Sequence, residues 1–348
     1  MRTNNFDFLR LLFAIFIVIA HSYPLSGSSV TENWLTKLTL NQIEFSNLGL
    51  SGFFIISGYL IFESLGRSKT LKSYFWKRIL RLFPALFMIL LLTVILAPFV
   101  YESEIPYVQN RSVYWYIPRN LSLYNLKYNI KGVFENNSYP NAINGSLWTI
   151  CYEFTLYILL SFLFFIKNKV GKLVLIFTTF LIMLLLEIFS SKLIDSISFY
   201  GLSSYHFLKL GTFFVAGALL ASLQIEKLKY KTAFLVFSFL LIVVSIYFKF
   251  YTHIKFFMLT IFIILLGIQS INPFNKVTKI GDFSYGIYIY SFPIQQTLMY
   301  YFKLNTLSLM FWSVLLSVIF GCLSWHLIEK RALLYKDVFN NSSFKFIL

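Results

Sequence analysis

Long apolar runs separated by short polar segments dominate the chain. Ten of these runs approach the roughly 20 residues that a transmembrane helix needs. They lie at about 7–24, 46–64, 82–100, 146–166, 173–190, 206–224, 232–249, 254–271, 283–302 and 307–327. The pattern predicts an all-α, polytopic membrane bundle of about ten transmembrane helices.

The predicted bundle fills residues 1–330, and a short cytoplasmic tail, 331–348, follows it. The first run is not typical of a cleaved signal peptide, because charged residues interrupt its start and no small-x-small cleavage site follows it. One long polar segment, about 101–145, is rich in Tyr, Trp, Asn and Ser. It suits either an interfacial aromatic belt or an outer platform for a sugar.

Composition supports the membrane assignment. Of the 348 residues, 58% are hydrophobic and 13% are charged, against roughly 45–50% and 25% in soluble domains. So much apolar surface excludes an ordinary soluble enzyme, a disordered tail and a disulfide-stapled secreted domain.

The net charge of +16 follows the predicted topology. With the N-terminus inside, 20 of the 30 Lys and Arg residues fall on the inner side, as the positive-inside rule requires. An even number of spans returns the C-terminus to the cytoplasm. The charge excess therefore needs no nucleic-acid partner.

Two ionisable residues of the first run lie on one helix face. Arg10 and His21 are eleven residues apart, which is three turns plus about 20°, or about 16 Å along the axis. Alone, Arg10 suits a snorkelling anchor and His21 an interfacial histidine. Together they indicate a polar stripe that lines a cavity, since ionisable groups in a membrane are functional candidates.

The fourth run contributes a carboxylate at a similar depth. Glu153 lies about 10 Å below the outer end of that run, so we expect it to pair with His21 and orient the imidazole. The alternative is a structural pair with an Arg or a backbone group. Glu187, in the fifth run, has no motif around it and is interpreted as structural.

Arg78 and Arg81 stand three residues apart at the inner end of the third run. Two neighbouring guanidinium groups can grip phosphates bidentately. The alternative is ordinary topogenic charge or contact with lipid headgroups. Cys151 and Cys322 fall inside apolar runs and are interpreted as packing residues, and no motif predicts a bound metal or cofactor.

Motifs over almost the whole chain resemble those of the acyltransferase family 3 membrane proteins. They are Asp7-Phe8-Leu9-Arg10 with His21, Gly52–Ile61 with its Phe-Phe pair and Ser-Gly-Tyr-Leu-Ile, Arg78 with Arg81, Ser146-Leu147-Trp148-Thr149 with Glu153, Ser284–Tyr288, and Ile328-Glu329. The order of the motifs and their places on the spans carry the resemblance.

The resemblance implies transfer of an acyl group, usually acetyl from acetyl-CoA, to a hydroxyl of a surface glycan or lipid-linked saccharide. It places the protein in a bacterial inner or plasma membrane. Arg78 and Arg81, with Arg10, would hold the CoA phosphates. His21 would act as general base or transient acyl carrier, and Glu153 would position it.

We expect Ser57, Trp148 and Tyr152 to line the substrate cavity. The chain departs from the family pattern at Ser291, where many members have His, and at Ser51, where Asp is common, so no role is carried over to either. Only about 20 residues follow the last run, too few for the esterase-like domain that some relatives carry. A transporter or flippase for a lipid-linked saccharide, or an acyltransferase acting on a small molecule, remains the alternative.

Overall fold

The computed structural model describes residues 4–189, 197–271, 274 and 280–339. In these ranges each of the ten predicted runs contains a helix. The helices are α1 (Phe6–Leu25), α3 (Phe45–Gly66), α4 (Leu71–Leu96), α6 (Trp148–Ser161), α7 (Lys169–Phe189), α9 (Ser204–Ser222), α10 (Lys231–Tyr247), α11 (Tyr251–Ile268), α13 (Ser284–Phe302) and α14 (Thr306–Ser324). The described strands are the two-residue β1 (Ser198–Phe199) and β2 (Leu202–Ser203). The all-α prediction is therefore confirmed, and the end of the predicted tail, 340–348, lies outside the described residues.

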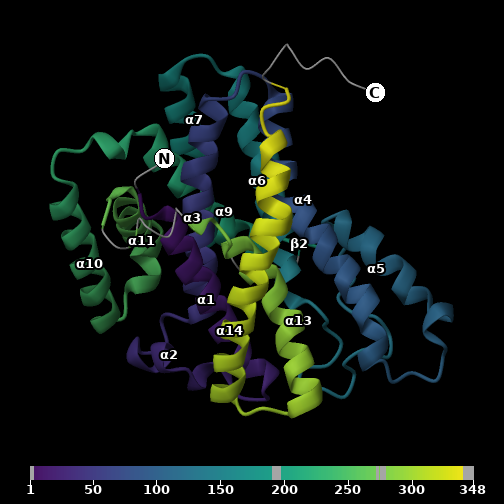
Figure 1. The fold of residues 1–348 in the computed structure, drawn as a ribbon. Coiled ribbons are helices and arrows are strands. Elements are labelled where there is room, and N and C mark those ends of the chain that lie inside the picture. The colour runs from purple at the N-terminus through teal and green to yellow at the C-terminus, as the bar shows by residue number, and fades with distance from the viewer. Residues whose placement is uncertain (1–3, 190–196, 272–273, 275–279, 340–348) are drawn as a thin grey trace.

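The helices form a multi-pass membrane bundle. In the described ranges, eight helices are long and apolar enough to cross a membrane. Helix α10 has 17 residues, and α13 carries buried Gln295 and Gln296 in place of apolar side chains. Helices α13 and α14 pack together on one side of α1, and α10 pairs with α11 on another (Figure 1). The exact number of spans and the orientation of the termini stay predictions.

Helix α4 begins well before the predicted third span. It starts at Leu71, where the side chain of Thr70 accepts a hydrogen bond from the backbone N–H of Ser73 at 3.1 Å. Charged residues count against membrane burial but not against helix formation, because Lys and Arg are good helix formers. Arg78 and Arg81 therefore lie within a continuous helix.

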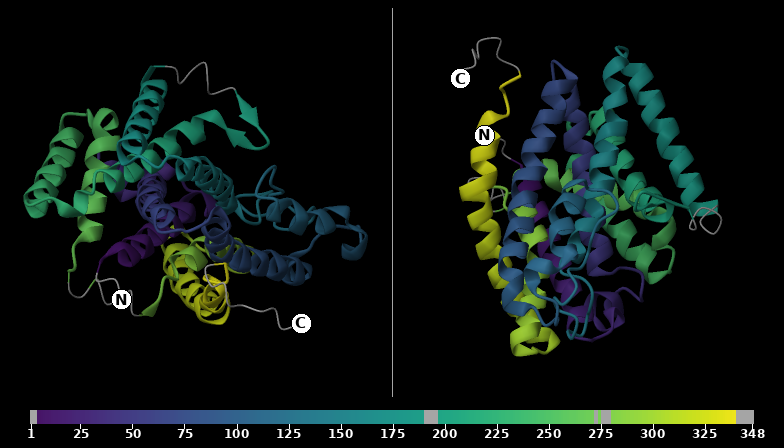
Figure 2. Two further views of the ribbon diagram at one scale, coloured as in Figure 1. Left: turned by 90° about the horizontal axis from the view of Figure 1, so that it is seen from above. Right: turned by 90° about the vertical axis from the view of Figure 1, so that its right-hand side faces the viewer.

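Residues 101–145 fold beside the bundle around the short helix α5 (Arg111–Leu121), which lies at its edge (Figure 2). Pro293 in α13 lacks a backbone N–H, so the carbonyl of Ile289, four residues earlier, is left without its helical partner. The side chain of Asn144 donates to that carbonyl at 2.8 Å. The end of the segment is thereby anchored to α13.

Helix α14 continues into a π-helical turn, η8 (Trp325–Glu329), followed by α15 (Lys330–Ala332) and the 3₁₀ turn η9 (Leu333–Tyr335). A π-turn shifts the side chains that follow it around the helix axis relative to a regular α-helix. Glu329 at its end is completely buried. The turn therefore points a carboxylate into the bundle.

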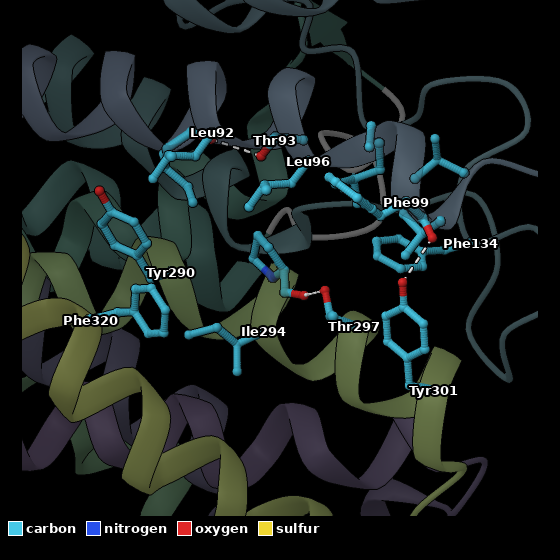
Figure 3. Close-up of a pocket in the computed structure, with 16 residues that line it drawn as sticks. Leu92, Thr93, Leu96, Phe99, Phe134, Tyr290, Ile294, Thr297, Tyr301 and Phe320 are labelled. Atoms are coloured by element: carbon cyan, nitrogen blue, oxygen red, sulfur yellow. Dashed lines mark hydrogen bonds between the residues drawn. The ribbon is translucent and has the colours of Figure 1, made fainter. Parts of the chain in front are cut away.

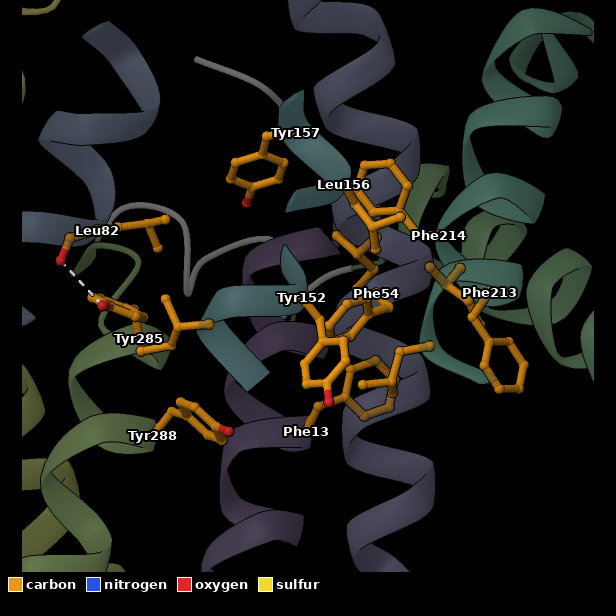
Figure 4. Packing of buried hydrophobic residues seen from close by; sticks show 14 of the residues in the cluster. Phe13, Phe54, Leu82, Tyr152, Leu156, Tyr157, Phe213, Phe214, Tyr285 and Tyr288 are labelled. Atoms are coloured by element: carbon orange, nitrogen blue, oxygen red, sulfur yellow. Dashed lines mark hydrogen bonds between the residues drawn. The ribbon is translucent and has the colours of Figure 1, made fainter. Parts of the chain in front are cut away.

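Helices α3 and α9 approach closely through two glycines. A Cβ atom on Gly58 would lie 1.9 Å from the backbone oxygen of Phe214, and one on Gly217 would lie 2.1 Å from that of Ile55. Small residues permit such backbone contact in membrane bundles. Phe213 and Phe214 of α9 then pack into the aromatic core (Figure 4).

We expect Gly58→Ala to destabilise the protein by about 1–3 kcal/mol or more, because the added methyl group must push two backbones apart. The control is Gly66→Ala on the same helix, where an added Cβ would meet no described atom within 4 Å. Thermal melting of the purified protein in detergent measures both. Equal melting temperatures for the two variants would contradict the close approach.

Candidate active site

A cavity of about 610 Å³ lies where α1 ends and α9 begins, and we call it the His21 cavity. Helices α1, α6, α9 and α13 and the segments that precede α6 and α9 line it. Aromatic side chains form much of its wall, namely Tyr128, Tyr139, Trp148, Tyr152 and Phe292. Tyr128 and Tyr139 come from the 101–145 segment, whereas Tyr114 and Trp115 of α5 are exposed. Part of that segment thus faces the cavity and part faces outward.

His21 presents an imidazole to this cavity from the last turns of α1. Its Nδ1 atom is buried and has no hydrogen-bond partner among the described residues. The ring lies edge-on to Phe292, with 5.2 Å between centroids. One residue along α1, the Ser22 hydroxyl accepts a hydrogen bond from Gln295 at 2.9 Å. An imidazole that lines a cavity can act as a base toward a bound ligand.

A second histidine faces the same cavity and was not singled out in the sequence. The His206 ring lies 4.6 Å from the Trp148 ring and 6.2 Å from the Tyr152 ring, measured between centroids. The Tyr152 hydroxyl is fixed by a hydrogen bond from the backbone N–H of Ser203 at 2.8 Å. No sequence motif surrounds His206, and only the β2–α9 junction brings it to the site. The expected cavity positions of Trp148 and Tyr152 agree with the structure.

Glu153 does not pair with His21 in the described structure, which makes the expected pairing wrong. Its Oε1 atom accepts a hydrogen bond from Ser57 at 2.9 Å and another from Tyr157. The reason is the helix period: adjacent residues of α6 project about 100° apart. Tyr152 therefore faces the His21 cavity, and Glu153 faces elsewhere.

Glu153 lines a separate space of about 30 Å³, which we call the Arg10 cavity. Ser57, Thr149, Tyr288 and Arg10 also contribute to it. The hydroxyls of Thr149 and Tyr288 lie 2.6 Å apart. Ser57 was expected beside the substrate, and the structure brings it to Glu153.

Arg10 and Arg81 share one carboxylate, Asp282, just before α13. Arg10 is ion-paired to Asp282, and Arg81 Nη2 lies 2.6 Å from the same oxygen atom, Oδ2. Arg81 Nη1 also lies 3.3 Å from Glu329. These four residues form what we call the charge cluster. Asp282 was not predicted as a site residue. The signal in the sequence was an acidic residue directly before the apolar run 283–302, on the side of the bundle where Lys and Arg residues collect.

The charge cluster brings two guanidinium groups together with two carboxyl groups. Burial raises the pKa of Asp282. The guanidinium groups of Arg10 and Arg81 and the hydrogen bonds from Ser284 lower this pKa by more, so the net shift is downward. The Ser284 hydroxyl donates to Asp282 at 2.6 Å. Asp282 is therefore ionised at neutral pH. Both terminal nitrogens of Arg81 contact carboxyl groups, one from Asp282 and one from Glu329.

Arg78 has a different environment. It donates to the Ser64 hydroxyl at 2.7 Å, and its guanidinium carbon lies 5.6 Å and 5.9 Å from the ring centroids of Tyr74 and Tyr157. In the part of the chain that the structure describes, its Nε has no hydrogen-bond partner and no carboxylate forms an ion pair with it. Of the two predicted phosphate ligands, Arg78 is the one whose charge is available to an anion.

The remaining predicted positions have structural partners. Glu187 is paired with Lys255 at 3.4 Å, and the Ser291 hydroxyl donates to the backbone oxygen of Tyr288 at 3.1 Å. Cys151 and Cys322 are both free thiols. Within the described ranges, no three His, Cys, Asp or Glu side chains are grouped as metal ligands.

We expect Asp282→Asn to destabilise the protein by up to about 3–5 kcal/mol, because it leaves two partly buried guanidinium groups without their shared carboxylate. Glu63→Gln is the matched control. It removes an ion pair to Arg67, whose side chain is 55% exposed, and should cost at most about 1 kcal/mol. Melting temperatures of both proteins in detergent test this. A small, equal shift for both variants would show that the charge cluster is dispensable.

Comparison with known proteins gives three matches. Residues 3–326 match the model of a family described as an acyltransferase domain. The chain is 28% identical to the "O-acetyl transferase" of Shigella phage Sf6 over 95% of its own length and 96% of that protein. It is also 41% identical to "Nodulation protein 10" of Rhizobium leguminosarum bv. viciae, over 24% of this chain and 22% of that one. No solved structure matches the chain.

Proposed function

The chain belongs to the acyltransferase domain family, and from this premise we propose that it transfers an acetyl group from acetyl-CoA to a hydroxyl of a saccharide at the outer face of a bacterial inner membrane. One observation carries the acceptor side of the proposal. His21 lines a cavity walled by aromatic rings, and its buried Nδ1 atom has no hydrogen-bond partner among the described residues. Aromatic faces suit sugar rings, and the imidazole suits a hydroxyl. The similarity to a phage O-acetyl transferase supports the reaction type.

In the proposed reaction, a ring nitrogen of His21 removes the proton of the acceptor hydroxyl while the hydroxyl oxygen attacks the thioester carbonyl. The carbon–sulfur bond then breaks, the CoA sulfur leaves with the proton, and the acceptor oxygen keeps the acetyl group as an ester. General base catalysis of this kind contributes roughly 10²–10⁴-fold. The same position also allows His21 to carry the acetyl group transiently.

Charge availability supports a revised donor site. Arg81 and Arg10 already share Asp282, so we assign them to holding the bundle. Arg78, which lacks a carboxylate ion pair in the described structure, is the residue we assign to a CoA phosphate. We also assign Glu153 to the donor site. It accepts a hydrogen bond from Tyr157, and the ring of Tyr157 makes a cation–π contact with the guanidinium group of Arg78.

We expect His21→Ala to lower kcat/KM for acetyl transfer by at least about 10²-fold, because the acceptor hydroxyl loses its base. Membranes containing the protein are incubated with labelled acetyl-CoA and host saccharide fractions. His253→Ala is the control, since His253 lines another cavity, beside Glu187 and Lys255. Equal transfer by the His21 variant and the parent would refute the assignment.

The same assay separates the alternatives. If the parent labels no saccharide while a lipid-linked saccharide crosses the bilayer, the protein is a transporter. If it labels only a small molecule, the acceptor class is wrong.

We expect Arg78→Gln to raise the KM for acetyl-CoA at least about tenfold, because a hydrogen bond between charged groups contributes about 1.5–3 kcal/mol. The neighbouring Lys77→Gln removes the same charge one residue away and should leave KM within about twofold. Arg81→Gln should instead lower the melting temperature. An unchanged KM for the Arg78 variant, or a loss shared by Lys77→Gln, would count against the donor site.

A further inference from the structure

A second cavity of the protein differs sharply from the His21 cavity in its polar groups. It has a volume of about 290 Å³ and lies between the last turns of α4, the 3₁₀ turn η2 (Ala97–Val100) and helices α13 and α14 (Figure 3). The hydroxyl groups of Thr93, Thr297 and Tyr301 around it each donate to a backbone oxygen at 2.8 Å. Its lining therefore presents mainly hydrocarbon and gives a sugar little to bind to.

The His21 cavity is lined by hydrogen-bonding side chains that are imidazole, phenol, hydroxyl or amide groups. Besides three tyrosines, they are His21, His206, Asn141 and Ser203. No Asp, Glu, Lys or Arg is among the described residues that line this cavity. Burying a charged ligand group without a counter-charge is costly. The lining therefore favours an uncharged ligand that carries hydroxyl groups.

The two histidines reach this cavity from two different parts of its wall. His21 comes from α1 and packs edge-on against Phe292 of α13. His206 comes from the first turn of α9 and packs against Trp148 and Tyr152 of α6. Each imidazole thus has its own aromatic support. Because a sugar ring carries hydroxyl groups on adjacent carbons, one bound ring can offer a hydroxyl to each histidine.

The contacts between α6 and α9 hold the His206 ring in place. The backbone N–H of Ser203, directly before α9, donates to the Tyr152 hydroxyl at 2.8 Å, so α6 fixes where α9 begins. The His206 ring lies 4.6 Å from the Trp148 ring and 5.1 Å from the Tyr205 ring, measured between centroids. In the described part of the chain no group hydrogen-bonds to this ring, and neither of its nitrogens is buried. A positioned imidazole of this kind is suited to hydrogen-bond a ligand.

Resting on the proposed function, we propose that His206 binds a second hydroxyl group of an uncharged acceptor sugar and thereby selects which hydroxyl reaches His21. One face of the sugar lies against Trp148. A neutral imidazole has one nitrogen that donates and one that accepts a hydrogen bond, so either can meet a hydroxyl. A second contact fixes a ring that a single contact would leave free to turn, and orientation of this kind decides which atom reacts. His206 exchanges no proton in the transfer, and His21 remains the base.

Variants at position 206 separate ligand binding from packing. His206→Phe keeps an aromatic ring against Trp148 and removes both nitrogens, whereas His206→Gln removes the ring and keeps a donor and an acceptor. Membranes containing each protein are incubated with labelled acetyl-CoA and host saccharide fractions. NMR and fragmentation mass spectrometry then locate the acetyl group. The matched control is His253→Phe, which makes the same change in another cavity.

We expect the parent to acetylate one position of an uncharged sugar residue. His206→Phe should raise the KM for the acceptor about five- to tenfold, as the loss of one hydrogen bond predicts, and should spread the acetyl group over at least two positions. His206→Gln and His253→Phe should stay within about threefold of the parent and keep the single position. Transfer mainly to a uronic acid or another charged sugar would overturn the proposal. So would parental KM and selectivity in His206→Phe with losses in His206→Gln, which is the pattern of a packing role.

Hydrolysis of acetyl-CoA in the absence of acceptor distinguishes a binding residue from a base. Water needs His21 but no second contact, so His206→Phe should release acetate and CoA at the parent's rate, and His21→Ala should not. Loss of hydrolysis in His206→Phe would overturn the binding role. A parent that acetylates no saccharide would refute the proposed function itself, and this result is distinct from a parent that is active and a His206→Phe variant that matches it.

Discussion

One partly buried carboxylate, Asp282, ties α1 to α4. Asp282 binds Arg10 of α1 and Arg81 of α4, and Arg81 extends the contact to Glu329 on η8. A bilayer gives buried charges no water, so each must find its counter-charge inside the protein. The charge cluster therefore joins four parts of the chain that are far apart in sequence. Arg10 and His21 stand on the same helix. The ion pair between Arg10 and Asp282 therefore also helps to position His21 at the His21 cavity.

Helix α6 separates the two polar cavities. Tyr152 faces the aromatic His21 cavity, and Glu153, the next residue, faces the Arg10 cavity. The hydrogen bond between the hydroxyls of Thr149 and Tyr288 joins α6 to α13. In the proposed function, this arrangement keeps the charged donor side apart from the neutral acceptor side. Arg78 belongs to the donor side and His21 to the acceptor side.

The lengths of the apolar runs predicted the ten long helices, because membrane spans follow from local composition. Arg10 and His21 stand on one helix as expected, but they line two separate cavities and not one shared cavity. The partner of Glu153 could not be predicted, because it depends on the rotation of α6 relative to α1. Likewise, Asp282 and His206 reach their positions through a loop and a helix junction that carry no periodic signal. Helix α4 begins at Leu71, before the predicted span at 82–100, because charged residues end an apolar run without ending a helix.

In the proposed function, the acyl donor and the saccharide acceptor bind on opposite faces of the membrane and meet at His21. Sealed vesicles containing oriented protein test it most directly. Labelled acetyl-CoA is supplied on the face that contains Arg78, and the saccharide acceptor is supplied on the face that contains the His21 cavity. The account requires labelled saccharide in this arrangement and none when both substrates are confined to the Arg78 face. Efficient transfer with both substrates on that face would contradict it.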